Sequence, residues 1–132
     1  MEKKYFLIIS LILFSISLTQ IAFYQSIDCA EEAEGWVALI YGWGGIFNGS
    51  LICLSWLANP ALIVSWFTIK KTNISFTFSI LALFFCSFFY IYEILTNELK
   101  ITHFVGCYLW TLSALIMFLG NLYLITKKRA SR

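Results

Sequence analysis

The sequence predicts an all-α integral membrane protein, a four-helix bundle with both termini in the cytoplasm. Of its 132 residues, 61% are hydrophobic and 12% are charged, whereas soluble domains carry about 25% charged residues. Four long apolar stretches contain no charge, and nearly all basic residues flank them. Basic residues beside apolar spans gather on the cytoplasmic side. The eight flanking residues are Lys3, Lys4, Lys70, Lys71, Lys127, Lys128, Arg129 and Arg132.

The first expected span covers residues 5–24, a run of 20 residues without a charge. At 1.5 Å rise per residue, such a helix is ~30 Å long and matches one hydrocarbon core. A cleaved signal peptide is the rival interpretation, but its apolar region usually has ~7–15 residues and ends at a small-x-small site. Residues 24–28 offer no such site. We therefore expect a retained signal anchor.

The second apolar stretch, residues 36–69, is too long for a single straight span. Its 34 residues would form a helix of ~51 Å. Two short spans would place Lys70 and Lys71 on the outer side, against the charge rule. We therefore expect one main span over 46–69, preceded by a bent or interfacial segment over 36–45, with a bend or a close-packing point at Gly44-Gly45.

The third and fourth spans are expected over residues 72–93 and 104–126. Tyr and Trp residues fall near the expected ends of the spans, as is typical of the headgroup level. The connections are short, which favours antiparallel neighbours in one compact bundle. Residues 1–132 are accordingly expected to form a single membrane domain.

The most specific local motif is Trp56-Leu57-Ala58-Asn59-Pro60, inside the second span. Pro60 lacks a backbone N–H, so we expect a kink that leaves the Trp56 carbonyl without its helical partner. In lipid, that carbonyl and the Asn59 amide need other partners. Hydrogen bonds to neighbouring helices, or a gate or binding site at the kink, both fit this motif. Gly45 and Gly49 form a G-x-x-x-G spacing, which permits close helix approach.

A resemblance follows from Gly35-Trp36, the glycines up to Gly49, the Trp56–Pro60 motif and Leu109-Trp110. Together they resemble a pattern in small uncharacterised bacterial four-span membrane proteins. The resemblance covers most of the chain and implies a bacterial inner-membrane location. It implies no activity.

Acidic residues and the single histidine are expected together on the outer side. They form either a solvated surface or a contact patch for a cation or a basic partner. With one His in the chain, we expect no metal site and no cofactor. Cys29 and Cys107 are both placed outside, where an oxidising periplasm would allow a disulfide. The candidate contact residues are Asp28, Glu31, Glu32, Glu34, Glu93, Glu98 and His103.

These features favour a non-enzymatic accessory subunit, or an immunity protein that occupies a membrane-active toxin. Asp28 is the only Asp, and no Ser/His/Asp set is evident, so we expect no enzyme. The expected partners are the lipid bilayer and another membrane protein or a second copy. Basic residues at span ends do not form the contiguous face that nucleic acids require. The alternative function is a small transporter or channel subunit that acts as an oligomer.

Overall fold

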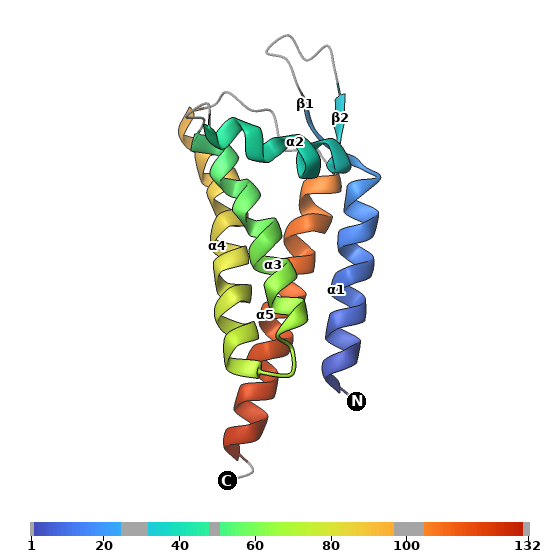
Figure 1. Cartoon of the computed structure of the whole chain (residues 1–132), viewed down its shortest axis with the longest axis vertical. Coiled ribbons are helices and arrows are strands. Elements are labelled where there is room, and N and C mark those ends of the chain that lie inside the picture. Colours follow the sequence, from blue (N-terminus) through green and yellow to red (C-terminus); the bar gives the residue numbers. More distant parts are fainter. Residues whose placement is uncertain (1, 25–31, 48–50, 97–104, 131–132) are drawn as a thin grey trace.

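Four helices of the computed structural model run side by side, and a fifth lies across one end of them (Figure 1). The structure describes residues 2–24, 32–47, 51–96 and 105–130. In chain order the elements are α1 (Glu2–Leu18), β1 (Ile21–Tyr24), β2 (Glu32–Glu34), α2 (Gly35–Phe47), the 3₁₀-helix η1 (Leu51–Leu57), α3 (Ala58–Phe67), α4 (Thr72–Thr96) and α5 (Val105–Ala130). The predicted all-α class is confirmed, with one small hairpin added.

Helix α5 is central to the packing. It contacts α1, α4 and α3, while α3 packs against α4. A tight turn over residues 68–71 joins α3 to α4, with the Lys71 N–H bonded to the Thr68 carbonyl at 2.7 Å. Figure 1 shows this turn at the same end as both termini. Helix α2 and the β1–β2 hairpin occupy the opposite end.

Two helices within the described residues are long and apolar enough to cross a membrane. These are α4, over Thr72–Ile91, and the whole of α5. Helix α1 has 17 residues, and the other apolar helical segment, Cys53–Phe67, is shorter.

The first helix is shorter than the expected 5–24. Helix α1 ends at Leu18, and the chain then forms β1, which pairs antiparallel with β2. The Ser17 and Thr19 hydroxyls donate to the carbonyls of Phe14 and Ile16, at 2.7 and 2.9 Å. Such bonds compete with continuation of the helix. Hydropathy could not locate this end, because residues 21–24 are as apolar as the helix before them.

The second apolar stretch also differs from its prediction. Helix α2 runs without a break through Gly44 and Gly45 to Phe47, so the expected bend at this pair is wrong. The chain changes direction between α2 and η1 (Figure 1). Pro60 is the third residue of α3. In a first helical turn the missing N–H costs little, so Pro60 does not interrupt an α-helix in its middle, and the kink stays a prediction.

The bundle has an inverted distribution of polarity. Large apolar side chains are exposed along α1, α4 and α5, including Ile12 at 52% and Phe84 at 61%. The interior instead contains small polar residues that are fully or almost fully buried. These are Ser10, Ser17, Ser55, Asn59, Ser65, Ser75, Ser79, Ser113 and Asn121.

Hydrogen bonds between helices satisfy this polar interior. The Trp66 indole donates to the Ser10 hydroxyl at 2.9 Å, and Ser10 donates to the Ser113 carbonyl at 2.9 Å, which links α3, α1 and α5. Nearer the basic end, Asn121 Nδ2 donates to Ser75 Oγ at 2.9 Å, and Ser75 donates to the Ser65 carbonyl at 2.8 Å. Among the described residues, no side-chain nitrogen or oxygen that is fully enclosed by protein lacks a partner.

Candidate functional site

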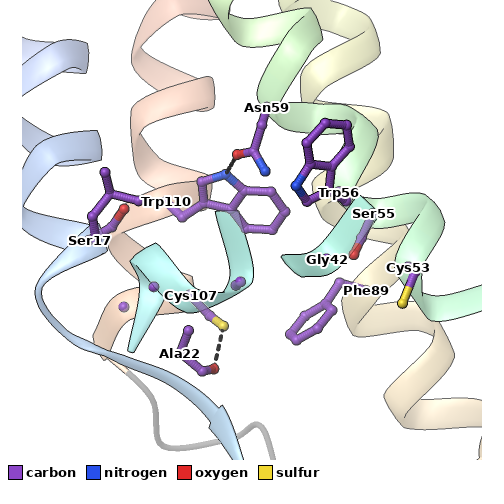
Figure 2. A pocket seen from close by; sticks show the side chains of 14 residues that line it. Ser17, Ala22, Gly42, Cys53, Ser55, Trp56, Asn59, Phe89, Cys107 and Trp110 are labelled. Carbon is purple, nitrogen blue, oxygen red and sulfur yellow. Dashed lines mark hydrogen bonds between the residues drawn. The ribbon is translucent and has the colours of Figure 1, made fainter. Parts of the chain in front are cut away.

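A pocket of about 270 Å³ lies beneath α2, at the end of the bundle that carries the hairpin. Every helix and strand β1 contribute to its wall, so it exists only in the assembled fold. Its lining is mainly apolar, with a few polar atoms. Figure 2 labels Ser17, Ala22, Gly42, Cys53, Ser55, Trp56, Asn59, Phe89, Cys107 and Trp110.

The side chain of Asn59 is the main polar group of this pocket. It is 7% exposed, and its Oδ1 accepts a hydrogen bond from Trp110 Nε1 at 2.9 Å. An indole nitrogen can only donate, so this bond fixes the orientation of the amide. Within the described part of the chain, no acceptor is bonded to Asn59 Nδ2. Figure 2 shows this nitrogen turned away from Trp110, toward the side of Trp56.

Trp56 attaches α2 to the bundle. Its indole nitrogen donates to the Leu39 carbonyl at 2.8 Å. A Cβ at Gly42 would lie 2.7 Å from Trp56 Cδ1, so a larger residue would push α2 away from the ring. The Trp56-Leu57-Ala58-Asn59-Pro60 motif therefore supplies two residues of the pocket wall, Trp56 and Asn59. Pro60 lies beside them in the first turn of α3.

The start of α5 closes another side of the pocket against β1. The Cys107 thiol donates to the Ala22 carbonyl at 2.8 Å. A Cβ at Gly106 would lie 2.6 Å from the Ile21 carbonyl oxygen, so this contact requires glycine. The Tyr90 hydroxyl accepts from or donates to Thr111 at 2.9 Å, and it donates to the Cys107 carbonyl at 3.1 Å. These bonds hold α4 and α5 together next to the pocket.

The predicted outer-face residues are only partly within the described structure. Glu34 belongs to β2, and its carboxylate accepts a hydrogen bond from the Trp36 indole. Glu32, Gly45 and Glu93 belong to β2, α2 and α4. The contact patch, the G-x-x-x-G packing and the Cys29–Cys107 disulfide stay predictions. Asp28, Cys29, Glu31, Gly49, Glu98 and His103 lie outside the described residues.

The opposite end of the bundle is basic. A recess of about 730 Å³ there is lined by Lys3, Lys70, Lys71, Lys128 and Arg129, together with neighbouring polar and apolar residues. Lys3 Nζ donates to Thr72 Oγ1 at 3.0 Å. The fold thus brings three basic clusters, far apart in the sequence, to one end.

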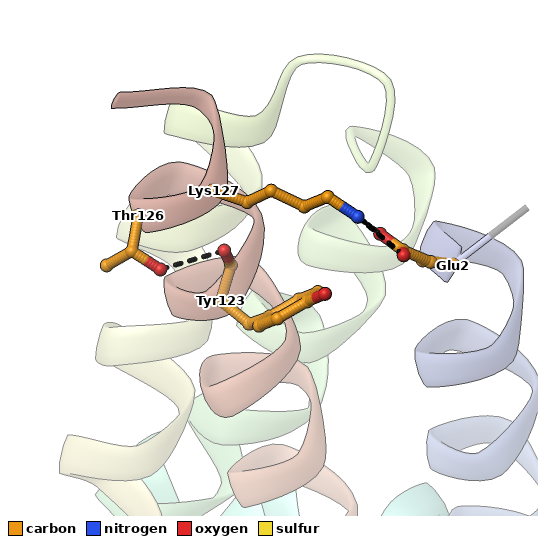
Figure 3. A network of polar contacts seen from close by, with 4 residues as sticks. All are labelled: Glu2, Tyr123, Thr126 and Lys127. Atoms are coloured by element: carbon orange, nitrogen blue, oxygen red, sulfur yellow. Dashed lines mark hydrogen bonds and ion pairs between the residues drawn. The ribbon is translucent and has the colours of Figure 1, made fainter. Parts of the chain in front are cut away.

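An ion pair joins the two termini at this basic end. Lys127 Nζ lies 2.7 Å from Glu2 Oε1 (Figure 3). The hydrogen bond to the Glu2 carboxylate raises the pKa of the Lys127 ammonium. Both side chains are about half exposed, at 55% and 46%, so water screens their attraction.

The sequence did not predict that Trp110, which lies in the fourth apolar run, bonds to Asn59. A usable signal existed, because a donor-only indole and a primary amide in two neighbouring spans are natural partners. The contact of Gly106 with β1 had no such signal, since the strand itself was expected to be helical.

No protein-family model, curated protein or solved structure matches this chain.

Proposed function

We propose that this chain is a four-span protein of the bacterial inner membrane, with both termini in the cytoplasm. We further propose that it works by binding another membrane component rather than by catalysis. The observation that carries the proposal is the inverted polarity of the bundle. A water-soluble bundle buries its large apolar residues, whereas here many of them cover the outside, and the inside holds serines and asparagines beside a few apolar side chains such as Leu62 and Met117.

Helices bury polar groups in this way when lipid surrounds them. Lipid tails are as apolar as Leu, so helices associate there through small residues and interhelical hydrogen bonds. Ser10, Ser75, Asn59 and Asn121 make such bonds. The proposal thus explains why side chains that prefer water occupy the centre of the bundle.

The dimensions support four spans. Helices α4 and α5 are ~38 Å and ~39 Å long, and α1 is ~26 Å long. The consecutive η1 and α3 together cover ~29 Å, because a 3₁₀-helix rises about 2.0 Å per residue. All four lengths are near or above the ~30 Å hydrocarbon core. The basic end would face the cytoplasm, in agreement with the positive-inside rule.

Helix α2 supplies the surface that we assign to a partner. Trp36, Ile40, Tyr41 and Trp43 are all exposed, between 45% and 67%. In the proposed orientation they lie at the outer headgroup level, where Trp and Tyr are favoured. A rigid aromatic surface above a bundle suits an accessory subunit or an immunity protein, because aromatic residues are enriched at protein interfaces.

Transport is the second candidate function. The pocket under α2 favours it, since a small molecule could be held there. Within one copy, Leu62 and Met117, each 1% exposed, fill the middle of the bundle. A pathway between copies would then be required, so transport depends on an oligomer.

Two measurements test the proposal. Reporter fusions after residues 24, 70 and 132 should report outside, inside and inside, and any other order would contradict the topology. For the partner, a photo-crosslinking amino acid at Tyr41 should capture a protein in cells. The same substitution at Phe67, which is 85% exposed at the basic end, should not. Equal capture at both positions would contradict a partner surface on α2.

A further inference from the structure

We infer that the pocket under α2 is a binding site for a membrane lipid, and that Asn59 Nδ2 donates a hydrogen bond to the ester carbonyl of one acyl chain. This inference rests on the proposed membrane function and adds a ligand to it. The structural basis is an apolar cavity lined by Asn59, whose Nδ2 has no acceptor among the described residues and is not fully enclosed by protein.

The pairing of Asn59 explains why the ligand must be an acceptor. Its Oδ1 is occupied by the Trp110 indole at 2.9 Å, which leaves the two N–H groups of Nδ2 as the available polar atoms of the side chain. An amide donor enclosed in apolar surroundings is stabilised strongly by a carbonyl. Phosphate and carboxylate are less suitable, because the described residues of the pocket wall include no Lys or Arg.

Water is a poor occupant of this cavity. A buried water typically needs two to four polar partners. The Trp110 and Trp56 indoles, the Cys107 thiol and the Ser17 hydroxyl already donate to protein oxygens. Asn59 Nδ2 is thus a nearly isolated donor on an apolar wall, which favours a mostly apolar ligand with one acceptor.

The volume indicates how much of a lipid enters. An engineered apolar cavity of ~150 Å³ holds one benzene molecule, so about 270 Å³ accommodates on the order of ten to twelve carbon or oxygen atoms. A complete phospholipid is far larger. The pocket therefore fits the carbonyl end and the first part of an acyl chain, with the headgroup outside.

The depth of the pocket agrees with this ligand. In the proposed orientation, α2 lies at the headgroup level, and the pocket lies directly beneath it. Ester carbonyls mark the same boundary between headgroups and acyl chains. Trp56, Trp110 and Phe89 provide aromatic walls for the chain.

The test compares two photoactivatable phosphatidylglycerols that differ only in an ester or an ether linkage to the labelled chain. Each is added as a minor component to nanodiscs of ether-linked lipid that contain the full-length protein. The ester probe should label peptides of α3 and α5 around Asn59 and Trp110 roughly five-fold more than the ether probe, as one neutral hydrogen bond predicts. Equal labelling by both probes would overturn the inference.

Paired variants identify the donor. In Asn59→Leu combined with Trp110→Phe, the amide is removed without leaving an unpaired indole, and the ester preference should fall to about one-fold. Trp110→Phe alone keeps the amide and should keep a clear preference. A preference that persists in the double variant would contradict the role of Asn59.

A second pair tests the cavity itself. Ala38 lines the pocket, whereas Ile40 on the same helix is 51% exposed. Ala38→Phe should reduce pocket labelling at least ten-fold, and Ile40→Phe should leave it unchanged. Unchanged labelling in Ala38→Phe would place the lipid elsewhere.

Labelling of Ile12, an exposed residue of α1, separates the two proposals. If peptides around Ile12 are labelled but the pocket is not, the lipid site is wrong and the membrane proposal stands. If Ile12 is not labelled either, the membrane proposal itself fails.

Discussion

The two ends of the bundle use the same kind of interhelical hydrogen bond with different results. At the basic end, Asn121 Nδ2 and the hydroxyl groups of Ser75 and Ser65 each donate to a protein oxygen. At the α2 end, Trp110 uses only the oxygen of Asn59, and a pocket remains beside it. Donors that all reach protein oxygens fix the positions of the helices. The Asn59 amide, whose Nδ2 has no acceptor among the described residues, can instead donate to a ligand in the adjacent cavity.

The two ends of the bundle also have close glycine contacts between different segments. Gly120 meets the Phe6 ring at the basic end, and Gly106 meets the β1 backbone at the other end. Both ends are therefore held by close contacts at the margin, and the α2 end retains a mainly apolar cavity beside these contacts. We expect the basic end to contribute stability and orientation, and the α2 end to contribute recognition.

The largest effect is expected from Gly120→Val. An added Cβ would lie 2.4 Å from Phe6 Cγ, close to the backbone of α1, so α1 must move away from α5. Overpacking of this kind costs about 1–3 kcal/mol or more. The thermal midpoint in detergent should fall clearly. Gly44→Val is the matched control, because no atom of the described residues lies within 4 Å of its added Cβ, and an equal loss there would refute the explanation.

The next effect is expected from Asn59→Leu. It leaves the Trp110 indole without its acceptor, which costs about 1–3 kcal/mol when the donor stays buried. Adding Trp110→Phe removes the unpaired donor and should restore part of the loss, measured by thermal unfolding of both variants. Double and single variants of equal stability would show that the bond does not hold α3 to α5.

A smaller effect is expected from Asn121→Leu at the basic end. Ser75 keeps its bond to the Ser65 carbonyl, so the loss is limited to the bonds of Asn121 Nδ2 to Ser75 Oγ at 2.9 Å and to Ser79 Oγ at 3.5 Å. Such bonds contribute about 0.6 kcal/mol on average and at most about 1.7 kcal/mol in a membrane protein. Unfolding in mixed micelles should show a modest shift, with lipid labelling of the distant pocket unchanged. A loss larger than that of Asn59→Leu would reverse our ranking of the two ends.

The smallest effect is expected from Lys127→Ala. The ion pair with Glu2 is about half exposed on both sides, and exposed pairs contribute little. The thermal midpoint should be the same as that of the unmutated protein at low and high salt. A salt-dependent loss of stability would assign the terminal ion pair a structural role.

The candidate site was predictable in part. The sequence identified Trp56 and Asn59 as a polar feature within an apolar run, and both line the pocket. It did not identify Trp110 or Cys107 as neighbours of that feature, because they are 51 and 48 positions away from Asn59 in the chain. The sequence also did not show that the chain changes from a 3₁₀-helix to an α-helix at Ala58, two residues before Pro60.

Composition and the positions of the charges can be read directly from the chain, and they determined the helical class and the grouping of basic clusters at one end. An apolar run flanked by lysines predicts a membrane span and its orientation, whatever the positions of the neighbouring helices. Only the tertiary structure decided that α1 stops at Leu18 to form a hairpin, that α2 lies across the bundle, and that Asn59 keeps one donor facing a cavity. These outcomes depend on hydrogen bonds and close contacts between distant segments, which no local pattern of residues specifies.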